Sequence, residues 1–140
     1  MEYKKLDASR WLLRLDPDDE IVASLGKLAA AEHIRLAMVQ GLGAVKKVVM
    51  GVYNVPQQAY KANTLIGAFE MLSLTGTLDT MAGKPYSHLH IAVGDEDGLA
   101  HGGHLNEAVI SATAEIVVTA LPGEVDRERS EVTGLNIWKF

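Results

Sequence analysis

Apolar and polar residues alternate over much of the chain, and this pattern predicts a fold built mostly of strands. The first clear strand is Arg10–Leu15, where aromatic and aliphatic residues lie between charged ones. Other stretches combine period-two alternation or β-branched residues with turn signals at their ends. We expect strands or extended segments at residues 34–40, 45–53, 60–65, 67–78, 87–93, 112–121 and 135–140.

One helix is expected near the start of the chain. Asp16 suits the N-cap, Pro17 suits the first helical position, and acidic residues follow in the first turn. Apolar residues then recur at helical spacing and predict one core-facing stripe, made of Ile21, Leu25, Leu28 and Ala29. The helix should end near His33, which we interpret as a structural residue whose partial positive charge suits a helix C-terminus.

Several connecting segments are also predicted. Residues 41–44 contain two glycines after a strand and indicate a tight turn, because the third glycine of a dinucleotide-binding loop would fall on Lys46. We expect loops at residues 54–58 and 79–85 and a single helical turn at 105–108. The acidic residues 95–98 lack the remaining ligands of a calcium loop and predict a turn. The mixed-charge run 124–131 should be solvated and without a catalytic role.

The chain has 140 residues, a length that predicts one domain over residues 1–140. One helix followed by mostly antiparallel strands predicts an α+β fold, with a sheet flanked by one or two helices. The absence of cysteine excludes disulfides, thiolate metal sites and cysteine nucleophiles. No apolar stretch has the length of a signal-peptide core or a membrane span, so we expect a cytoplasmic protein with no membrane partner.

The charge balance bears on possible partners. Thirteen basic and eighteen acidic residues give a net charge of −5, which argues against broad attraction to nucleic-acid backbones. Any contact with DNA would therefore be local or made through a partner protein. Hydrophobic residues make up 48% of the chain, at the top of the ordinary range, so part of the apolar surface is expected to be buried between subunits.

Histidines supply the candidate chemistry. Four of the five lie between Ser87 and Leu105. His88 and His90 are two apart in a predicted strand and therefore point to the same face, about 6.6 Å apart at the backbone. Gly102 and Gly103 would let the chain fold back and bring His104 beside them. The sequence therefore predicts a divalent metal site, with zinc the expected ion, held by three imidazole nitrogens.

His101, Glu70 and Glu115 are further polar candidates. We interpret His101 as a solvated loop residue, with a fourth metal ligand or a group that orients a ligand as the alternatives. Glu70 is expected at an exposed strand edge, although pairing or a functional role would also explain it. Glu70 or Glu115 could act as a general base only if the fold brings one of them to the histidines.

Four motifs, in order, give the chain a family likeness. They are Gly-x-Gly-Ala-Val at 41–45, Phe-Glu-Met-Leu-Ser-Leu-Thr-Gly at 69–76, His-Leu-His at 88–90 and Gly-Gly-His-Leu at 102–105. Together they resemble the plant-and-prokaryote-conserved (PPC) domain. That domain also occurs beside AT-hooks in plant nuclear proteins, and its bacterial and archaeal members are often labelled predicted DNA-binding proteins. The resemblance covers nearly the whole chain.

The resemblance implies an antiparallel sheet flanked by helices, a homotrimer, and a metal-holding cluster that carries over to His88, His90 and His104. Two departures bear on function. The chain has no Arg-Gly-Arg-Pro core of an AT-hook, and a trimer would carry three times −5, or −15. The plant segment Gly-Arg-Phe-Glu-Ile-Leu, which recruits other regulators, corresponds to residues 67–72, where Ala68 replaces the arginine.

Three functional hypotheses follow. The first is a homotrimeric, metal-binding PPC-domain protein with a DNA-associated or transcription-regulatory role exerted through assembly and partners. The second is a zinc-dependent enzyme that acts on a small molecule at the three-histidine site, although no H-E-x-x-H or G-x-S-x-G motif names a reaction. The third is a direct DNA binder, which the net charge argues against.

Overall fold

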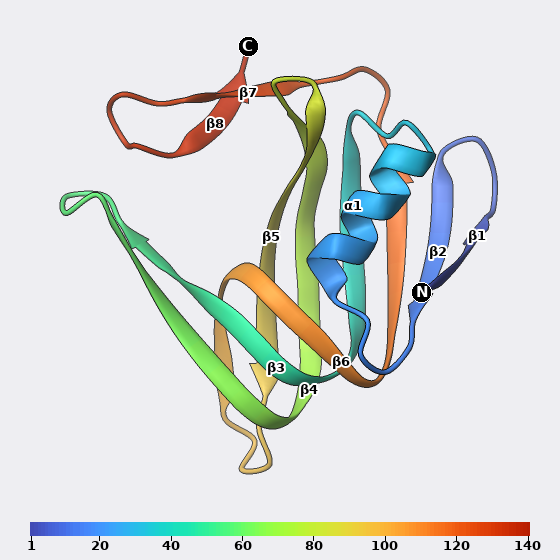
Figure 1. The fold of residues 1–140 in the computed structure, drawn as a ribbon, viewed down its shortest axis with the longest axis vertical. Coiled ribbons are helices and arrows are strands. Elements are labelled where there is room, and N and C mark those ends of the chain that lie inside the picture. Colours follow the sequence, from blue (N-terminus) through green and yellow to red (C-terminus); the bar gives the residue numbers. More distant parts are fainter.

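Eight strands and one helix form the fold in the computed structural model, which describes residues 1–140 (Figure 1). In chain order they are β1 (Glu2–Lys5), β2 (Arg10–Leu15), α1 (Ile21–Ala31), β3 (Ala37–Asn54), β4 (Ala59–Met81), β5 (Lys84–Gly94), β6 (Ala100–Ala120), β7 (Asp126–Arg129) and β8 (Asn136–Lys139). Strands follow the order β1-β2-β6-β3-β4-β7-β8, and β5 pairs with β4 and β6. Only the β4–β7 contact is parallel. The predicted α+β fold with a mostly antiparallel sheet is confirmed.

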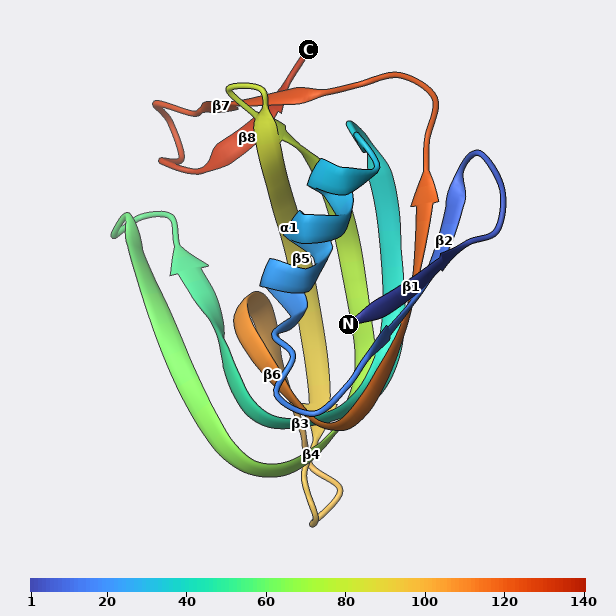
Figure 2. The same cartoon turned by 45° about the vertical axis from the view of Figure 1, so that its right-hand side comes forward.

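Strands β3, β4, β5 and β6 pair in a closed ring. β3 pairs with β4 and β6, and β5 pairs with the same two strands. The strands bend to close the ring because β-bulges increase local twist and curvature. Register shifts between Gly41 and Gly43, and between Met71 and Ser73, mark such bulges. In both ribbon views β3, β4 and β6 curve strongly at the lower end of the molecule (Figures 1 and 2).

The helix begins later than the sequence predicts. Its N-cap is Glu20, whose carboxylate accepts hydrogen bonds from the backbone N–H groups of Val22 and Ala23 at 3.0 and 2.6 Å. The expected start at Asp16 and Pro17 is wrong because β6 holds this segment in a turn. Asp18 N–H donates to the Ile110 carbonyl at 3.1 Å, and Ile110 N–H donates to the Asp19 carbonyl at 3.0 Å.

The predicted apolar stripe of α1 is confirmed. Ile21, Leu25 and Leu28 are fully buried and Ala29 is 2% exposed, within one core of 25 buried apolar residues. The helix packs against β5 and β6 on one face of the curved sheet (Figure 2). His33 lies just past the end of α1 with a positive φ of 54°, and the next N–H, from Ile34, donates back to the Ala29 carbonyl at 2.9 Å.

The turn predicted at residues 41–44 is wrong, because β3 continues through these residues as a bulged strand. A Cβ at Gly43 would lie 2.4 Å from the Thr113 carbonyl oxygen, and one at Gly41 would lie 2.8 Å from Ile116 Cγ1. These glycines therefore let β3 approach β6 closely inside the sheet. The separate strands predicted at 34–40 and 45–53 are one bent strand.

Two other connections differ from prediction. Residues 79–85 are a tight hairpin between β4 and β5 rather than a loop, and Asp79 is fully buried. Residues 105–108 continue β6 rather than forming a helical turn. The turns at 55–58 and 95–98 and the strands at Arg10–Leu15 and near the C-terminus are confirmed.

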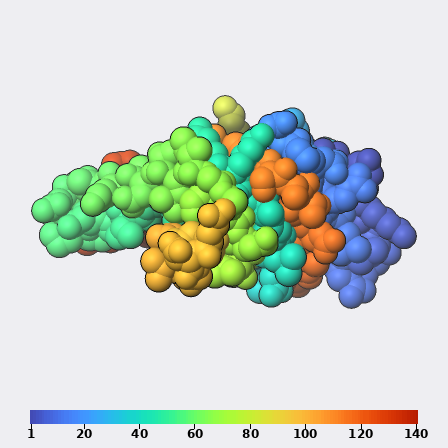
Figure 3. Space-filling model, turned by 90° about the horizontal axis from the view of Figure 1, so that it is seen from below, coloured from blue at the N-terminus to red at the C-terminus, as the bar shows by residue number.

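The β7–β8 hairpin lies across the end of the sheet, near the β4–β5 turn, and faces the tip of the β3–β4 hairpin (Figures 1 and 2). Seen from below, the N-terminal strands lie at one end of the molecule and the tip of the β3–β4 hairpin lies at the other (Figure 3). The remaining parts of β3, β4 and β6 lie between these two ends. The one helix, α1, has 11 residues and lacks the length and apolarity needed to cross a bilayer.

Candidate metal centre

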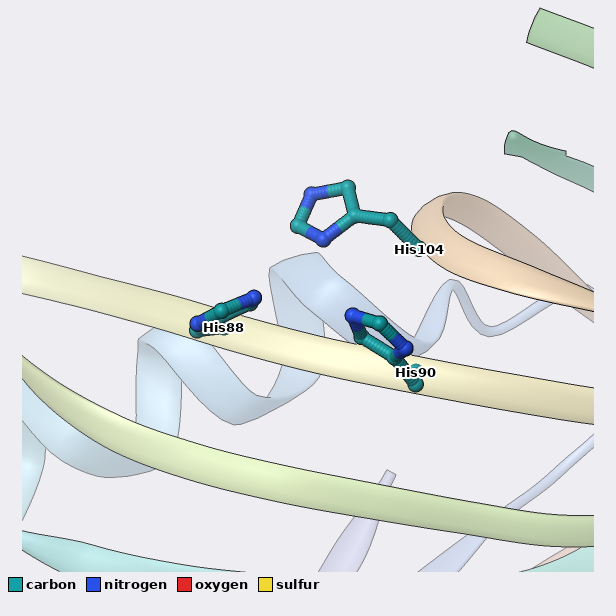
Figure 4. Close-up of side chains that lie close together, drawn as sticks. All are labelled: His88, His90 and His104. Atoms are coloured by element: carbon teal, nitrogen blue, oxygen red, sulfur yellow. The ribbon is translucent and has the colours of Figure 1, made fainter. Parts of the chain in front are cut away.

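Three imidazoles converge where β5 meets β6. His88 and His90 project from the same face of β5, as their spacing predicts, and His104 lies directly opposite His90 in the β5–β6 pairing. Their ring centroids are 5.3–5.6 Å apart, and one ring nitrogen from each residue lies within 4.8 Å of the others. Figure 4 shows the three rings pointing toward one another.

Glycines allow His104 to reach this position, but not through the backbone angles that the sequence suggested. Gly102 and Gly103 lie in β6 without positive φ angles, so they form no hinge. A Cβ at Gly103 would lie 2.7 Å from the Gly51 carbonyl oxygen on β3. The missing side chains therefore let β3 and β6 approach closely beside His104.

The electrostatics of the cluster favour neutral imidazoles, the form that binds metals. Partial burial lowers the pKa of His88 most, and the nearby Arg127 and His90 add to this effect, while Asp79 opposes it. Burial also lowers the pKa of His104, followed by the effects of His88, His90 and Arg127. At neutral pH both rings therefore carry free lone pairs for a cation.

Tyr60, on β4, supports the strand that carries His104. Its hydroxyl lies 2.5 Å from Asn106 Oδ1 and 3.1 Å from the His104 carbonyl oxygen, and it can donate to either. Its ring lies edge-on to the His104 ring, with centroids 6.2 Å apart. Burial raises the pKa of Tyr60, so its hydroxyl stays protonated at neutral pH. Sequence analysis missed this residue, because 44 positions separate it from His104.

A buried ion pair lies beside the histidines. Arg127 on β7 donates to both oxygens of Asp79, from Nε at 2.7 Å and from Nη2 at 2.6 Å. Trp138 Nε1 donates to the same carboxylate at 2.8 Å, and the Arg127 guanidinium lies over the ring of Tyr86. The prediction that residues 124–131 are solvated is therefore wrong for Arg127, whose side chain is only 3% exposed.

A cavity of about 950 Å³ opens in front of the cluster. The three histidines form one wall, the β3–β4 hairpin contributes Val52, Tyr53 and Tyr60, and β7, β8 and the turn between them form the opposite wall. No aspartate or glutamate lines it. The site is thus open to small molecules and contains no carboxylate that could act as a general base.

The remaining candidates lie outside this cavity. His101 Nε2 lies 2.8 Å from Asp95 Oδ2, next to the acidic turn, and is not one of the converging imidazoles. Glu115 lines a groove shared with Leu12 and Leu42 instead. Glu70 is exposed but does not lie at a sheet edge, because it pairs with both Ala44 and Gly94.

The donor set fits a divalent transition metal. The three ring nitrogens, within 4.8 Å of one another, form a group that could hold one ion, and zinc binds imidazole nitrogen readily. His88, His90 and His104 would hold it, and a zinc ion would supply Lewis acidity at the cavity. Imidazole suits zinc, copper, iron and nickel, so these ligands do not identify the metal.

The fold and the site define a class of protein: a small domain with an antiparallel sheet and three imidazoles on two adjacent strands. The model of the Plants and Prokaryotes Conserved (PCC) domain matches residues 4–122, and the chain therefore belongs to this family. The resemblance drawn from the sequence motifs is confirmed. No curated protein matches the chain.

Solved structures agree with this assignment. A candidate DNA-binding protein from Bacteroides thetaiotaomicron is 30% identical with a TM-score of 0.95, over 99% of this chain and 96% of that one. A metal-containing protein from Archaeoglobus fulgidus is 32% identical with a TM-score of 0.88, over 99% and 96% of the two chains. A PPC protein from Pyrococcus horikoshii is 28% identical with a TM-score of 0.86, over 94% and 91%.

Proposed function

We propose that this chain is a metal-binding PCC-domain protein that assembles as a homotrimer and has a DNA-associated, regulatory role. The observation that carries the proposal is the convergence of His88, His90 and His104. The metal-containing relative from Archaeoglobus fulgidus, 32% identical over nearly the whole chain, supports a metal in this family. We assign zinc as the ion because three imidazoles facing an open cavity are typical of zinc sites.

An exposed apolar surface supports the trimer. Leu12, Leu42, Leu72 and Val117, on four different strands, are 41–59% exposed and line a groove of about 600 Å³. Clustered apolar side chains of this kind mark surfaces that associate with other proteins. The high apolar content of the chain agrees with burial of this surface between subunits.

The DNA-associated role rests on the relatives. The Bacteroides thetaiotaomicron protein, 30% identical, is a candidate DNA-binding protein. A trimer of this chain would carry three times −5, or −15, and would repel DNA at long range. The proposed role is therefore exerted through partner proteins. Gel shifts at about 150 mM salt should show little binding by the purified protein alone, and tight binding would contradict this part of the proposal.

A zinc-dependent enzyme acting on a small molecule is the second candidate, and the open cavity favours it. Neither Glu70 nor Glu115 lies at the cavity, so neither can be its general base. Because the three histidines would hold the ion, any proton transfer would fall to a hydroxyl group such as that of Tyr86. The first candidate needs no such group.

Elemental analysis of untagged protein tests the metal assignment. We expect about one divalent ion per chain, and the loss of that ion when His88 and His104 are both replaced by alanine. The matched control replaces His33 and His101, which lie outside the cluster, and should retain the metal. Full metal content in the His88→Ala/His104→Ala variant would overturn the assignment.

A further inference from the structure

The cavity in front of the three histidines has the opposite charge to the rest of the molecule. The chain carries eighteen acidic residues and a net charge of −5, yet no acidic side chain lines the cavity. Its wall contains the guanidinium groups of Arg127, which is paired with the buried Asp79 carboxylate, and Arg129, which adds a net positive charge. A concave site lined by charge of one sign focuses the field and attracts ions of the opposite sign.

The two arginines differ in what they can bind. Arg127 is not free to pair with a ligand, because its guanidinium already donates to Asp79 and, at 2.9 Å, to the Asn136 carbonyl. Arg129 is exposed and takes part in no ion pair or side-chain hydrogen bond. It is therefore the cationic side chain in the cavity that is free to pair with a ligand.

Tyr86 supplies a second donor. Its hydroxyl accepts a hydrogen bond from Asn136 Nδ2 at 3.4 Å, which leaves its own proton available to a ligand. The surrounding wall is apolar or aromatic, with Leu135, Ile137 and Trp138 on the side of β8. A volume of about 950 Å³ falls within the range of cavities that bind whole organic molecules, and it far exceeds what an inorganic ion requires.

We propose that this cavity binds a small organic carboxylate, whose anionic end pairs with Arg129 and whose body packs against the aromatic wall. The inference rests on the proposed metal centre for the charge at the imidazole end. It adds the chemical class of the ligand. Arg129 and the apolar wall formed by β8 lie beyond residue 122, where the match to the family model ends.

Binding can be tested with cobalt-loaded protein, because the visible spectrum of Co²⁺ responds to ligands at or near the ion. The probes are acetate, succinate, benzoate and 4-hydroxyphenylacetate, with benzamide and 4-hydroxyphenylacetamide as neutral counterparts. We expect at least one of the larger carboxylates to shift the spectrum saturably and raise the melting temperature. Its affinity should be at least about tenfold higher than that of acetate, and the amides should have no effect.

Arg129→Gln should weaken that binding by about tenfold, the usual scale for losing one charge-assisted hydrogen bond, without changing the cobalt content. Lys139→Gln is the matched control. This substitution removes one positive charge from the same hairpin, but Lys139 does not line the cavity. The Lys139→Gln variant should therefore bind the carboxylate as tightly as the unmodified protein does.

Three results would overturn the inference: equal responses to carboxylates and amides, no carboxylate that binds more tightly than acetate, or unchanged affinity in Arg129→Gln. Each leaves the metal assignment standing, because the cobalt spectrum itself shows that the ion is bound. Failure of the protein to take up cobalt at all would instead remove the metal proposal, and this inference with it.

Discussion

The guanidinium of Arg127 and the carboxylate of Asp79 form a bidentate ion pair, and the two side chains are only 3% and 0% exposed. This pair joins the β7–β8 hairpin to β4 and fixes one wall of the cavity. Trp138 donates to the same carboxylate, so both strands of the hairpin are tied to one buried acid.

Replacing Arg127 with leucine should lower the free energy of unfolding by about 3–5 kcal/mol, because Asp79 would remain buried and charged without its partner. Urea denaturation provides the measurement. Arg14→Leu is the control, since Arg14 is 53% exposed in its ion pair with Asp16 and its loss should cost about 1 kcal/mol or less. Equal losses in the two variants would contradict the structural role of Arg127.

Metal occupancy should be complete at pH 7.5 and should fall as the pH drops below about 6.5, because protonated imidazole cannot bind a metal. The lowered pKa values of His88 and His104 place this loss below the range of a free histidine. Equilibrium dialysis followed by elemental analysis across pH 8 to 5 measures it. Constant occupancy over that range would exclude histidine ligation.

The same pKa shifts determine how the stability of the metal-free protein depends on pH. Below about 6.5 the unfolded chain takes up protons at these positions while the folded chain resists them. The histidine contribution to stability is therefore complete above that pH and declines as the pH falls toward the folded-state pKa values. Urea midpoints at pH 7.5 and 5.5 should differ by less in the His88→Ala/His104→Ala variant.

Gly103→Ala should destabilise the protein by about 1–3 kcal/mol and reduce metal affinity, because the new methyl group would meet the Gly51 carbonyl and push β6 and His104 outward. Gly26→Ala provides a contrast of opposite sign. A Cβ at this helical position meets nothing within 4 Å, so the substitution should stabilise the protein by about 0.5–1 kcal/mol. Thermal melts and chelator competition distinguish the two.

Leu42→Glu should convert trimers to monomers, because it places a charge among the exposed leucines of the groove proposed as the subunit contact. Light scattering coupled to gel filtration reports the mass. Val132→Glu introduces the same charge at a residue that is 85% exposed and outside the groove, and should leave the assembly unchanged. Trimers that persist in Leu42→Glu would show that this groove is not the contact.

Local patterns predicted the elements that depend on neighbouring residues. The stripe of Ile21, Leu25 and Leu28 indicated the buried face of the helix, and the spacing of His88 and His90 placed both rings on one face of β5. Glycine was harder to interpret. The glycines at residues 41–44 indicate a turn when only neighbouring residues are considered. In the sheet they allow close contact between β3 and β6, and this contact depends on a partner strand about 70 residues later.

The rest of the site depends on contacts between distant residues. Arg127 and Asp79 are 48 positions apart, and each lies in a segment whose local composition indicates solvent exposure. The sequence Asp-Arg-Glu-Arg at 126–129 has no apolar face, so no periodicity signals a buried side chain there. Tyr60 likewise gains its role only when the β3–β4 hairpin folds beside β6.

The histidines stand on β5 and β6, two strands of the closed ring, whereas the wall facing them belongs to a separate C-terminal hairpin. On the two proposals made above, the ion and the organic ligand would therefore depend mainly on different segments of the polypeptide. On these proposals, substitutions among residues 129–138 should alter which molecule is accepted and leave the three imidazole nitrogens in place.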